Sequence, residues 1–148
     1  SGRNLVRLVD DAKNKPPCDY FSVMPGMVLF LELKSTGCAG MPMLDVRPHQ
    51  LVAMHRYDRA APDIYAGFVI QFRSASDHPI YYLSGADLYQ YAHDVCGGPH
   101  TESLRGHYLS NRCLHDHSIL IPSFMPTPRA RAPQLDIDHF LDTLKRPA

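Results

Sequence analysis

The most informative pattern of apolar and polar positions lies at residues 28–34, which read VLFLELK. Successive side chains of a strand point to opposite faces, so Phe30, Glu32 and Lys34 would share one face. Both faces are apolar as far as Leu31, which is typical of a central strand that is covered on both sides. The pattern therefore predicts that the two charged side chains emerge together where the strand leaves the core.

The patterns along the rest of the chain predict a mixed α/β domain. Alternating or continuous apolar runs predict strands, and apolar residues at helical spacing predict helices. The predicted strands are residues 20–24, 27–34, 64–73, 79–83 and 117–121, and the predicted helices are residues 4–13, 48–60, 87–95 and 135–144. A turn at Pro25-Gly26 joins the first two strands into a hairpin, and residues 35–44 form a loop. This order of elements is not that of a doubly wound parallel sheet.

We expect one domain over residues 1–148, because this length and a hydrophobic content of 45% suit a single buried core. Residues 1–17 are predicted to be an N-terminal helix and linker, and residues 124–134 a proline-rich linker to the last helix. No apolar run is long enough for a membrane span, so no membrane partner is expected. The first residues do not resemble a signal peptide.

The charge balance and the cysteine spacing bear on the expected partners and on the expected cellular compartment. Lys and Arg together number 15 and balance 15 Asp and Glu, so the net charge neither requires nor excludes a polyanionic partner. The 4 cysteines have irregular spacings and form no C-x-x-C motif. This usage indicates reduced thiols in a cytosolic protein.

Asp19 adds a second acid beside the charged end of the VLFLELK segment. A hairpin that turns at Pro25-Gly26 folds Asp19 back beside residues 32–33. Two carboxylates this close repel each other unless a cation lies between them, and Mg²⁺ prefers such oxygen ligands. A lysine beside the metal can orient a water or stabilise charge on a phosphate. The alternative is a simple Glu32–Lys34 ion pair at the end of a strand.

Asp19 followed by Glu32-x-Lys34 resembles the PD-(D/E)xK nuclease signature, and CDYFSVMPGMVLFLELKST resembles the catalytic hairpin of RecU-type Holliday-junction resolvases. Further segments are similar to this family, in the same order, along residues 15–144. They are Met41-Pro42, Pro48-His49-Gln50-Leu51, residues 66–70, residues 80–83 with 86–88, and residues 135–141. The resemblance implies a restriction-endonuclease-like fold, in which helices flank a mixed central sheet.

The resemblance also implies which residues form the site. Asp19, Glu32 and the backbone carbonyl of Leu33 would bind Mg²⁺, for which Mn²⁺ can substitute. Lys34 would orient the attacking water or stabilise developing charge, and Gln50 would lie near Lys34 or the scissile phosphate. The alternative for Gln50 is an exposed polar residue at the start of a helix.

The chain departs from the family upstream of Asp19. Related resolvases have another acid on an N-terminal helix, and only Asp10 and Asp11 are available here as candidate metal ligands. The alternative is that both are surface charges of the predicted helix. The 18 residues before Asp19 leave no room for the stalk that RecU proteins carry at this place, so junction binding by that element is not expected.

The resemblance implies a Mg²⁺-dependent endonuclease that hydrolyses DNA phosphodiesters and resolves Holliday junctions or other branched DNA in recombination and repair. Symmetric cleavage of a junction needs two active sites, so a homodimer with two-fold symmetry is expected. Such proteins occur in bacteria and phages, which implies the cytoplasm of a bacterial cell or of a phage-infected host. Two alternatives are a duplex-cutting restriction or repair nuclease of the same fold, and a non-catalytic DNA-binding or zinc-stabilised scaffold.

Cysteines and histidines between residues 96 and 117 are a rival candidate site, for Zn²⁺. They are Cys96, His100, Cys113, His115 and His117. Their spacing matches no standard zinc finger, and C-x-H-x-H on a straight strand strains tetrahedral geometry. A Cys–His nucleophile is favoured even less, because nothing in the sequence marks an activated thiol.

Four tyrosines, at positions 81, 82, 89 and 91, are candidates for stacking on nucleic-acid bases. Core packing is the alternative and explains at least half of them. Strand alternation predicts that Tyr82 lies on the same face as Ile80 and that Tyr81 points outward.

Overall fold

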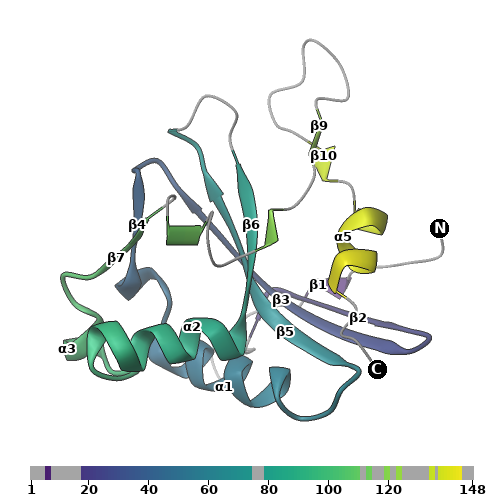
Figure 1. Ribbon diagram of the computed structural model, residues 1–148, viewed down its shortest axis with the longest axis horizontal. Coiled ribbons are helices and arrows are strands. Elements are labelled where there is room, and N and C mark those ends of the chain that lie inside the picture. Colours follow the sequence, from purple (N-terminus) through teal and green to yellow (C-terminus); the bar gives the residue numbers. More distant parts are fainter. Residues whose placement is uncertain are drawn as a thin grey trace.

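A six-stranded mixed sheet forms the centre of the protein (Figure 1). The computed structural model describes residues 6–7, 18–74, 79–110, 113–114, 119–120, 123–124, 134–135 and 137–144. The strand order is β1-β2-β3-β5-β6-β8. These strands are β1 (Val6–Arg7), β2 (Tyr20–Met24), β3 (Met27–Thr36), β5 (Ile64–Phe72), β6 (Ile80–Ser84) and β8 (Ile119–Leu120). The predicted class, a single α/β domain with helices against a mixed sheet, is confirmed.

The first strands form an antiparallel meander whose hairpin is the predicted one. β2 pairs with β3 so that Met24 lies opposite Met27 and Tyr20 opposite Leu31. The turn between them is Pro25-Gly26, and Gly26 has φ +75°, a left-handed conformation that costs glycine little. This tight turn fixes the register of the hairpin.

A strand, a helix and a parallel strand follow one another after the hairpin turn. Helix α1 (Pro48–Asp58) connects β3 to β5, which pairs with β3 in parallel so that Glu32 lies opposite Phe68. Pro48 begins the helix as predicted, because proline has no N–H that the first turn would leave unpaired. β6 and then β8 continue the sheet in antiparallel pairings.

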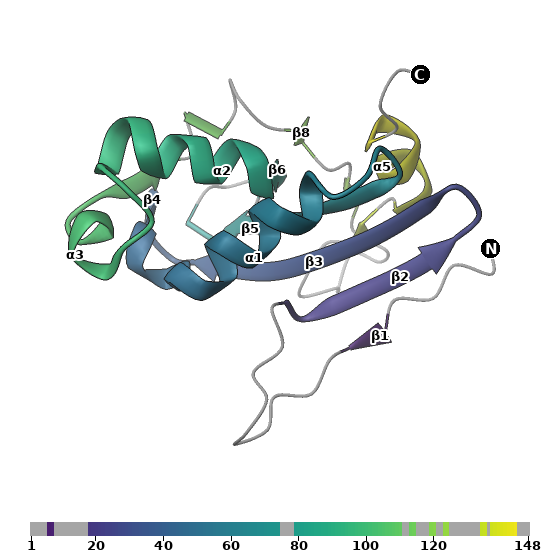
Figure 2. The same cartoon turned by 90° about the horizontal axis from the view of Figure 1, so that it is seen from below.

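Helices cover both faces of this sheet, and each face has its own apolar core. α1 and helix α2 (Gly85–Tyr91) run side by side (Figures 1 and 2). They bury Leu51, Met54 and Leu88 against Phe68 and Ile70 of β5. On the other face, helix α5 (Ile137–Leu144) places its own apolar residues against the strands. This second core contains Met27, Leu29, Leu31, Tyr65, Val69, Ile80, Tyr82, Phe140, Leu141 and Leu144. The double cover explains the continuous apolar run of β3.

A buried acid ties α1 to its neighbours. Asp58, the last residue of α1, is buried, and its carboxylate accepts hydrogen bonds from the N–H of Ala66 (3.2 Å) and of Ala86 (3.3 Å). These two bonds join the end of α1 to β5 and to the first turn of α2. Ser84 caps α2 by accepting a hydrogen bond from the N–H of Asp87 (3.1 Å). The pair of helices is thereby fixed against the sheet.

The prediction of a helix over residues 4–13 is wrong for the two residues of this range that the structure describes. Val6 and Arg7 form β1 and pair with Phe21 and Tyr20 of β2. Their apolar spacing fits a helix, but pairing with β2 satisfies backbone groups that would otherwise lie at an open sheet edge. The other residues of that predicted helix, including Asp10 and Asp11, lie outside the described residues.

The loop predicted at residues 35–44 is also wrong in part. β3 continues to Thr36, and β4 (Gly40–Pro42) pairs with β7 (Tyr108–Ser110) in a separate two-stranded sheet. A short 3₁₀ turn, Met43–Asp45, then leads to α1. The pairing of β4 joins segments far apart in the sequence, which local patterns do not reveal.

The second half of the chain follows the predictions with shifted boundaries. Helical structure runs from α2 into a π-helical turn, η2 (Ala92–Cys96), and the short helix α3 (Thr101–Leu104) begins at the end of the CGGPHT loop. Of the strand predicted at residues 117–121, β8 is described. The ends of the predicted 124–134 linker pair with each other, because β9 (Ser123–Phe124) lies antiparallel to β10 (Gln134–Leu135). Among the described residues, no helix is both long enough and apolar enough to cross a membrane.

The close contact between α1 and α2 generates a stability prediction. A Cβ atom added at Gly85 would lie 2.5 Å from the carbonyl carbon of Met54 and 3.0 Å from the N of His55. We expect Gly85→Ala to lower the free energy of unfolding by about 1–3 kcal/mol, because the backbone of α1 would have to move away from the added methyl group. Urea denaturation followed by circular dichroism measures this change.

Gly37→Ala is the matched control, because an added Cβ there would meet only the tip of Arg73 at 3.6 Å. An equal loss of stability in both variants would contradict the proposed packing of the two helices.

Candidate functional site

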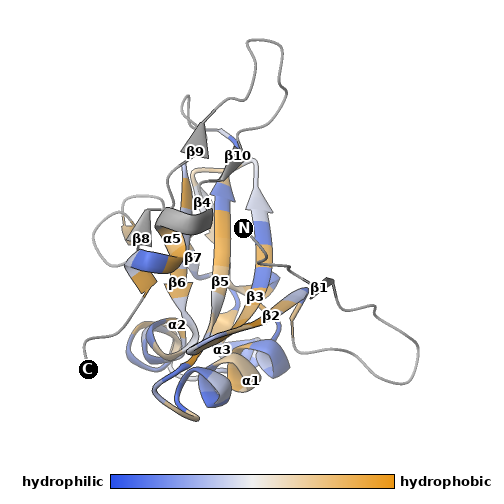
Figure 3. Ribbon diagram, turned by 90° about the vertical axis from the view of Figure 1, so that its right-hand side faces the viewer, coloured by the Kyte–Doolittle hydropathy of each residue, from blue (hydrophilic) through white to orange (hydrophobic). Residues whose placement is uncertain are grey.

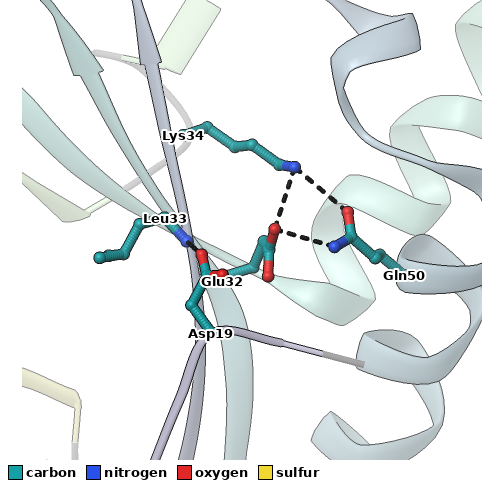
Figure 4. A network of polar contacts seen from close by, with 5 residues as sticks. All are labelled: Asp19, Glu32, Leu33, Lys34 and Gln50. Atoms are coloured by element: carbon teal, nitrogen blue, oxygen red, sulfur yellow. Dashed lines mark hydrogen bonds and ion pairs between the residues drawn. The ribbon is translucent and has the colours of Figure 1, made fainter. Parts of the chain in front are cut away.

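Asp19 is held at the end of the hairpin by both its backbone and its side chain. Its N–H donates a hydrogen bond to the carbonyl of Leu31 (3.1 Å), and its Oδ2 accepts one from the N–H of Leu33 (2.9 Å). The carboxylate therefore takes the place of a further strand partner for β3. This bond also fixes the position of Asp19 beside Glu32, as the hairpin register predicts (Figure 4).

Glu32, Lys34 and Gln50 form a closed triangle of polar contacts (Figure 4). Glu32 Oε1 accepts a hydrogen bond from Gln50 Nε2 (2.8 Å) and lies 3.0 Å from Lys34 Nζ. Lys34 Nζ also donates to Gln50 Oε1 (3.2 Å). Each of the three side chains thus contacts the other two, which fixes the direction of all three.

Gln50 reaches this triangle because it lies in the first turn of α1 and points toward β3. It is 8% exposed, so the alternative of an exposed residue at the helix start is wrong. Glu32 is 4% exposed and remains inside the core, although the strand pattern predicts that it emerges with Lys34. The reason is that α1 extends over the end of β3 and covers it.

Burial has electrostatic consequences for Glu32. Its pKa is raised above the ordinary value of 4.5, first by burial and further by the charge of Asp19. Lys34 and Gln50 oppose the shift, because their hydrogen bonds favour the ionised carboxylate. The second oxygen, Oε2, is buried and has no hydrogen-bond partner among the residues that the structure describes. A buried carboxylate oxygen without a partner is costly, and a cation bound to it would remove that cost.

The backbone carbonyl of Leu33 lies on the same edge of β3 as Asp19. The carbonyl of Leu31 faces β2, and strand geometry directs the N–H and carbonyl of every second residue to the same side. β2 begins at Tyr20, so this edge of β3 has no β2 strand partner beyond Leu31. The carbonyl implied as a metal ligand therefore faces the side where Asp19 lies.

These groups fit a hard divalent cation of the Mg²⁺ or Mn²⁺ kind. The two carboxylates and one carbonyl are oxygen donors, which such cations prefer, and water supplies the remaining ligands. In the described part of the chain, no group of three or more His, Cys, Asp or Glu side chains is placed to hold a metal. The site thus offers two carboxylates, while Asp10 and Asp11, the candidates for a third, lie outside the described residues.

Cys18 is a neighbour of the site that no motif in the sequence marks. It is buried, and its thiol donates a hydrogen bond to the carbonyl of Tyr20 (3.3 Å). Burial first, and then the charges of Glu32 and Asp19, raise the pKa of this thiol to about 12. The thiol is therefore protonated at neutral pH, which argues against a nucleophilic role. Its position directly before Asp19 is the only sequence signal for it.

The rival zinc site is only partly within the described residues. Cys96 is buried, which raises the pKa of its thiol, and Cys113 is half-buried. His115 and His117 lie outside the described residues, so a site that includes them stays a hypothesis.

The four tyrosines are mostly core residues. Tyr81 and Tyr82 are both buried, so the expectation that Tyr81 points outward is wrong, because both sheet faces are covered. Tyr89 and Tyr91 are partly buried against the first core. The predicted grouping of Tyr82 with Ile80 is confirmed.

Comparison with known proteins adds no family assignment. No family model matches the chain, and a search of curated proteins gave no significant match.

The raised pKa of Glu32 generates a prediction for the pH dependence of stability. Between the unfolded pKa near 4.5 and the higher folded pKa, the folded state binds more protons than the unfolded state. The free energy of unfolding therefore falls as the pH rises through this window. Glu32→Gln removes this titration, so we expect the stability of the wild type relative to Glu32→Gln to decrease with increasing pH.

Urea denaturation of both proteins at a series of pH values above 4, in chelator, measures this difference. If the stability of the wild type relative to Glu32→Gln stayed constant or increased with pH, the conclusion that burial raises the pKa of Glu32 would be wrong.

Proposed function

We propose that the protein is a metal-dependent endonuclease that hydrolyses phosphodiester bonds of DNA. The observation that carries the proposal is the meeting of Asp19 and Glu32 at one end of a hairpin, beside Lys34. Oε2 of Glu32 supports it, because no described residue satisfies this buried oxygen and a bound cation would. A purely structural ion pair between Glu32 and Lys34 would not require Asp19 at the same place.

The residues have distinct roles in this proposal. Asp19, Glu32 and the carbonyl of Leu33 hold Mg²⁺ or Mn²⁺, which when bound polarises the phosphate and lowers the pKa of a bound water. Lys34 has three N–H donors, of which Glu32 and Gln50 engage two. The third is available to a water or to a phosphate oxygen, where it orients the nucleophile or stabilises negative charge. Gln50 keeps the ammonium group and the carboxylate in place.

The proposed substrate is a four-way DNA junction or another branched DNA. This choice rests on the resemblance of the hairpin and of the segments that follow it to RecU-type resolvases. Two symmetric cuts require two sites, so the proposed active form is a homodimer in the cytoplasm of a bacterium or of a phage-infected cell. A nuclease that cuts ordinary duplex, and a protein that binds DNA without cutting it, are the other outcomes that the first experiment distinguishes.

Cleavage of synthetic DNA tests the proposed chemistry. We expect Mg²⁺- or Mn²⁺-dependent cutting of a labelled four-way junction in preference to linear duplex of the same sequence. Asp19→Asn and Glu32→Gln should abolish cutting, and Lys34→Met should slow it by about 100-fold or more, because one charge-stabilising donor is lost. Denaturing gel electrophoresis of the products measures the rate.

Asp19→Asn removes the charge but not the structural contact, because its amide oxygen can still accept the hydrogen bond from the N–H of Leu33. Equal cutting of linear duplex would leave a nuclease but remove the junction preference. Binding of DNA without cutting in either metal would overturn the proposal of an enzyme.

Metal binding can be tested without DNA. We expect Mn²⁺ to raise the melting temperature of the wild type, because a ligand of the folded state stabilises it in proportion to the logarithm of its concentration above Kd. The increase should vanish in Asp19→Asn and in Glu32→Gln. Calorimetry over a range of Mn²⁺ concentrations measures it, with Asp87→Asn, an exposed acid away from the site, as control. The same increase in all four proteins would show that Mn²⁺ binds elsewhere.

A further inference from the structure

An exposed apolar surface continues from Glu32 along the hairpin. Residues that lie opposite each other in β2 and β3 share a face, so Phe21 lies beside Phe30 and Val23 beside Val28. Phe30 is on the face of Glu32 and Lys34, two residues before Glu32, a span of about 7 Å along a strand. Val23 is 69% exposed on this face. We call Phe21, Phe30 and Tyr57 of α1 the aromatic platform.

α1 explains why this face is open. The helix packs over β3 and β5 and leaves β2 uncovered in the view of Figure 2. Figure 3 shows that stretches of β2 and β3 consist of apolar residues. Within the described part of the chain, the helices on this side are α1, α2 and α3, and Phe21 and Phe30 are only half-buried.

Tyr57 is the outer ring of the aromatic platform. Its ring stacks on Phe30 with centroids 4.8 Å apart and an angle of 21° between the planes. Gln50 and Tyr57 are seven residues apart, two turns of a helix, so both point toward β3 from one side of α1. Gln50 contacts Glu32 and Lys34, while Tyr57, which is 36% exposed, contacts Phe30. One helix thus aligns the platform with the polar triangle.

An exposed cation borders the platform on α1. Arg56 is exposed beside Tyr57, while Lys34, at the other end of the surface, is paired with Glu32. A ring that can stack, beside the exposed guanidinium of Arg56, is complementary to a nucleotide with its base unpaired and its phosphates charged. An apolar protein partner would gain nothing from this guanidinium.

We propose that the aromatic platform binds an unpaired nucleobase next to the phosphate that is cut. A base on the outer face of Tyr57 would extend the stack of Tyr57 on Phe30 by one ring. The platform thereby favours substrates in which a base beside the scissile bond is already unstacked, such as branch points and frayed ends. This inference rests on the proposed function, because it assigns the platform to the substrate of the same site.

Binding of DNA in EDTA, where no cleavage occurs, tests the platform independently of catalysis. The probe is a short duplex with one unpaired 2-aminopurine, compared with the same duplex fully paired. We expect the wild type to quench the fluorescence and to bind the unpaired probe about tenfold more tightly than Tyr57→Ala does. Tyr57→Phe should behave as the wild type, because it keeps the ring.

Tyr108→Ala is the matched control, since Tyr108 is 61% exposed on β7, away from the platform. Circular dichroism and sedimentation check that each variant is folded and has the wild-type oligomeric state. The inference would be overturned if Tyr57→Ala bound both probes with the same affinities as the wild type. It would also be overturned if Tyr57→Ala changed the oligomeric state, because a second copy of the chain would then occupy this face. If Tyr57→Ala still cleaved DNA and bound the probes as the wild type does, the proposed role of the platform would be wrong and the proposed nuclease activity would stand. Quenching by the wild type without any cleavage in Mg²⁺ would instead overturn the proposed chemistry.

Discussion

The pairing of β2 with β3 in one register is the constraint on which the candidate site depends. With Met24 opposite Met27, Asp19 comes to lie beside Glu32, and its side chain accepts the N–H of Leu33. A shift of one residue would turn every side chain of the strand to the other face. The apolar residues of β3 oppose such a shift, since Leu29 and Leu31 are buried in the core that contains α5. The core therefore holds the acids in place.

Burial of Glu32 links the fold to the proposed chemistry. An ionised carboxylate inside a protein needs partners, and among the described residues Lys34 and Gln50 contact only one of its oxygens. Oε2 of Glu32 and the raised pKa of this carboxyl group show that burying Glu32 costs free energy, which the rest of the fold offsets. Such costs are typical of functional sites, where groups are kept ready for a ligand. The same helix that buries Glu32 carries Tyr57, so the polar site and the aromatic platform share one support.

Much of the fold follows from local patterns in the sequence. The Pro25-Gly26 turn, the apolar run of β3 and Pro48 at the start of α1 each predict the element that is observed. The predictions fail where distant segments decide the structure. Val6 and Arg7 pair with β2, and β4 pairs with β7, so backbone pairing across the chain overrides the local preference. Tyr81 is buried because a helix layer covers a face that strand alternation alone leaves open.

For the site, local patterns along the chain are enough to establish which charged groups meet. A tight turn and a fixed two-residue alternation are local rules, and they suffice to bring Asp19 beside Glu32 and to place Lys34 on the same face. Long-range packing is responsible for the burial of Glu32, for the contact of Gln50 with Glu32 and Lys34, and for the stacking of Tyr57 on Phe30. These contacts depend on where α1 crosses the sheet. That position is set by packing between segments distant in the chain, which no local pattern encodes.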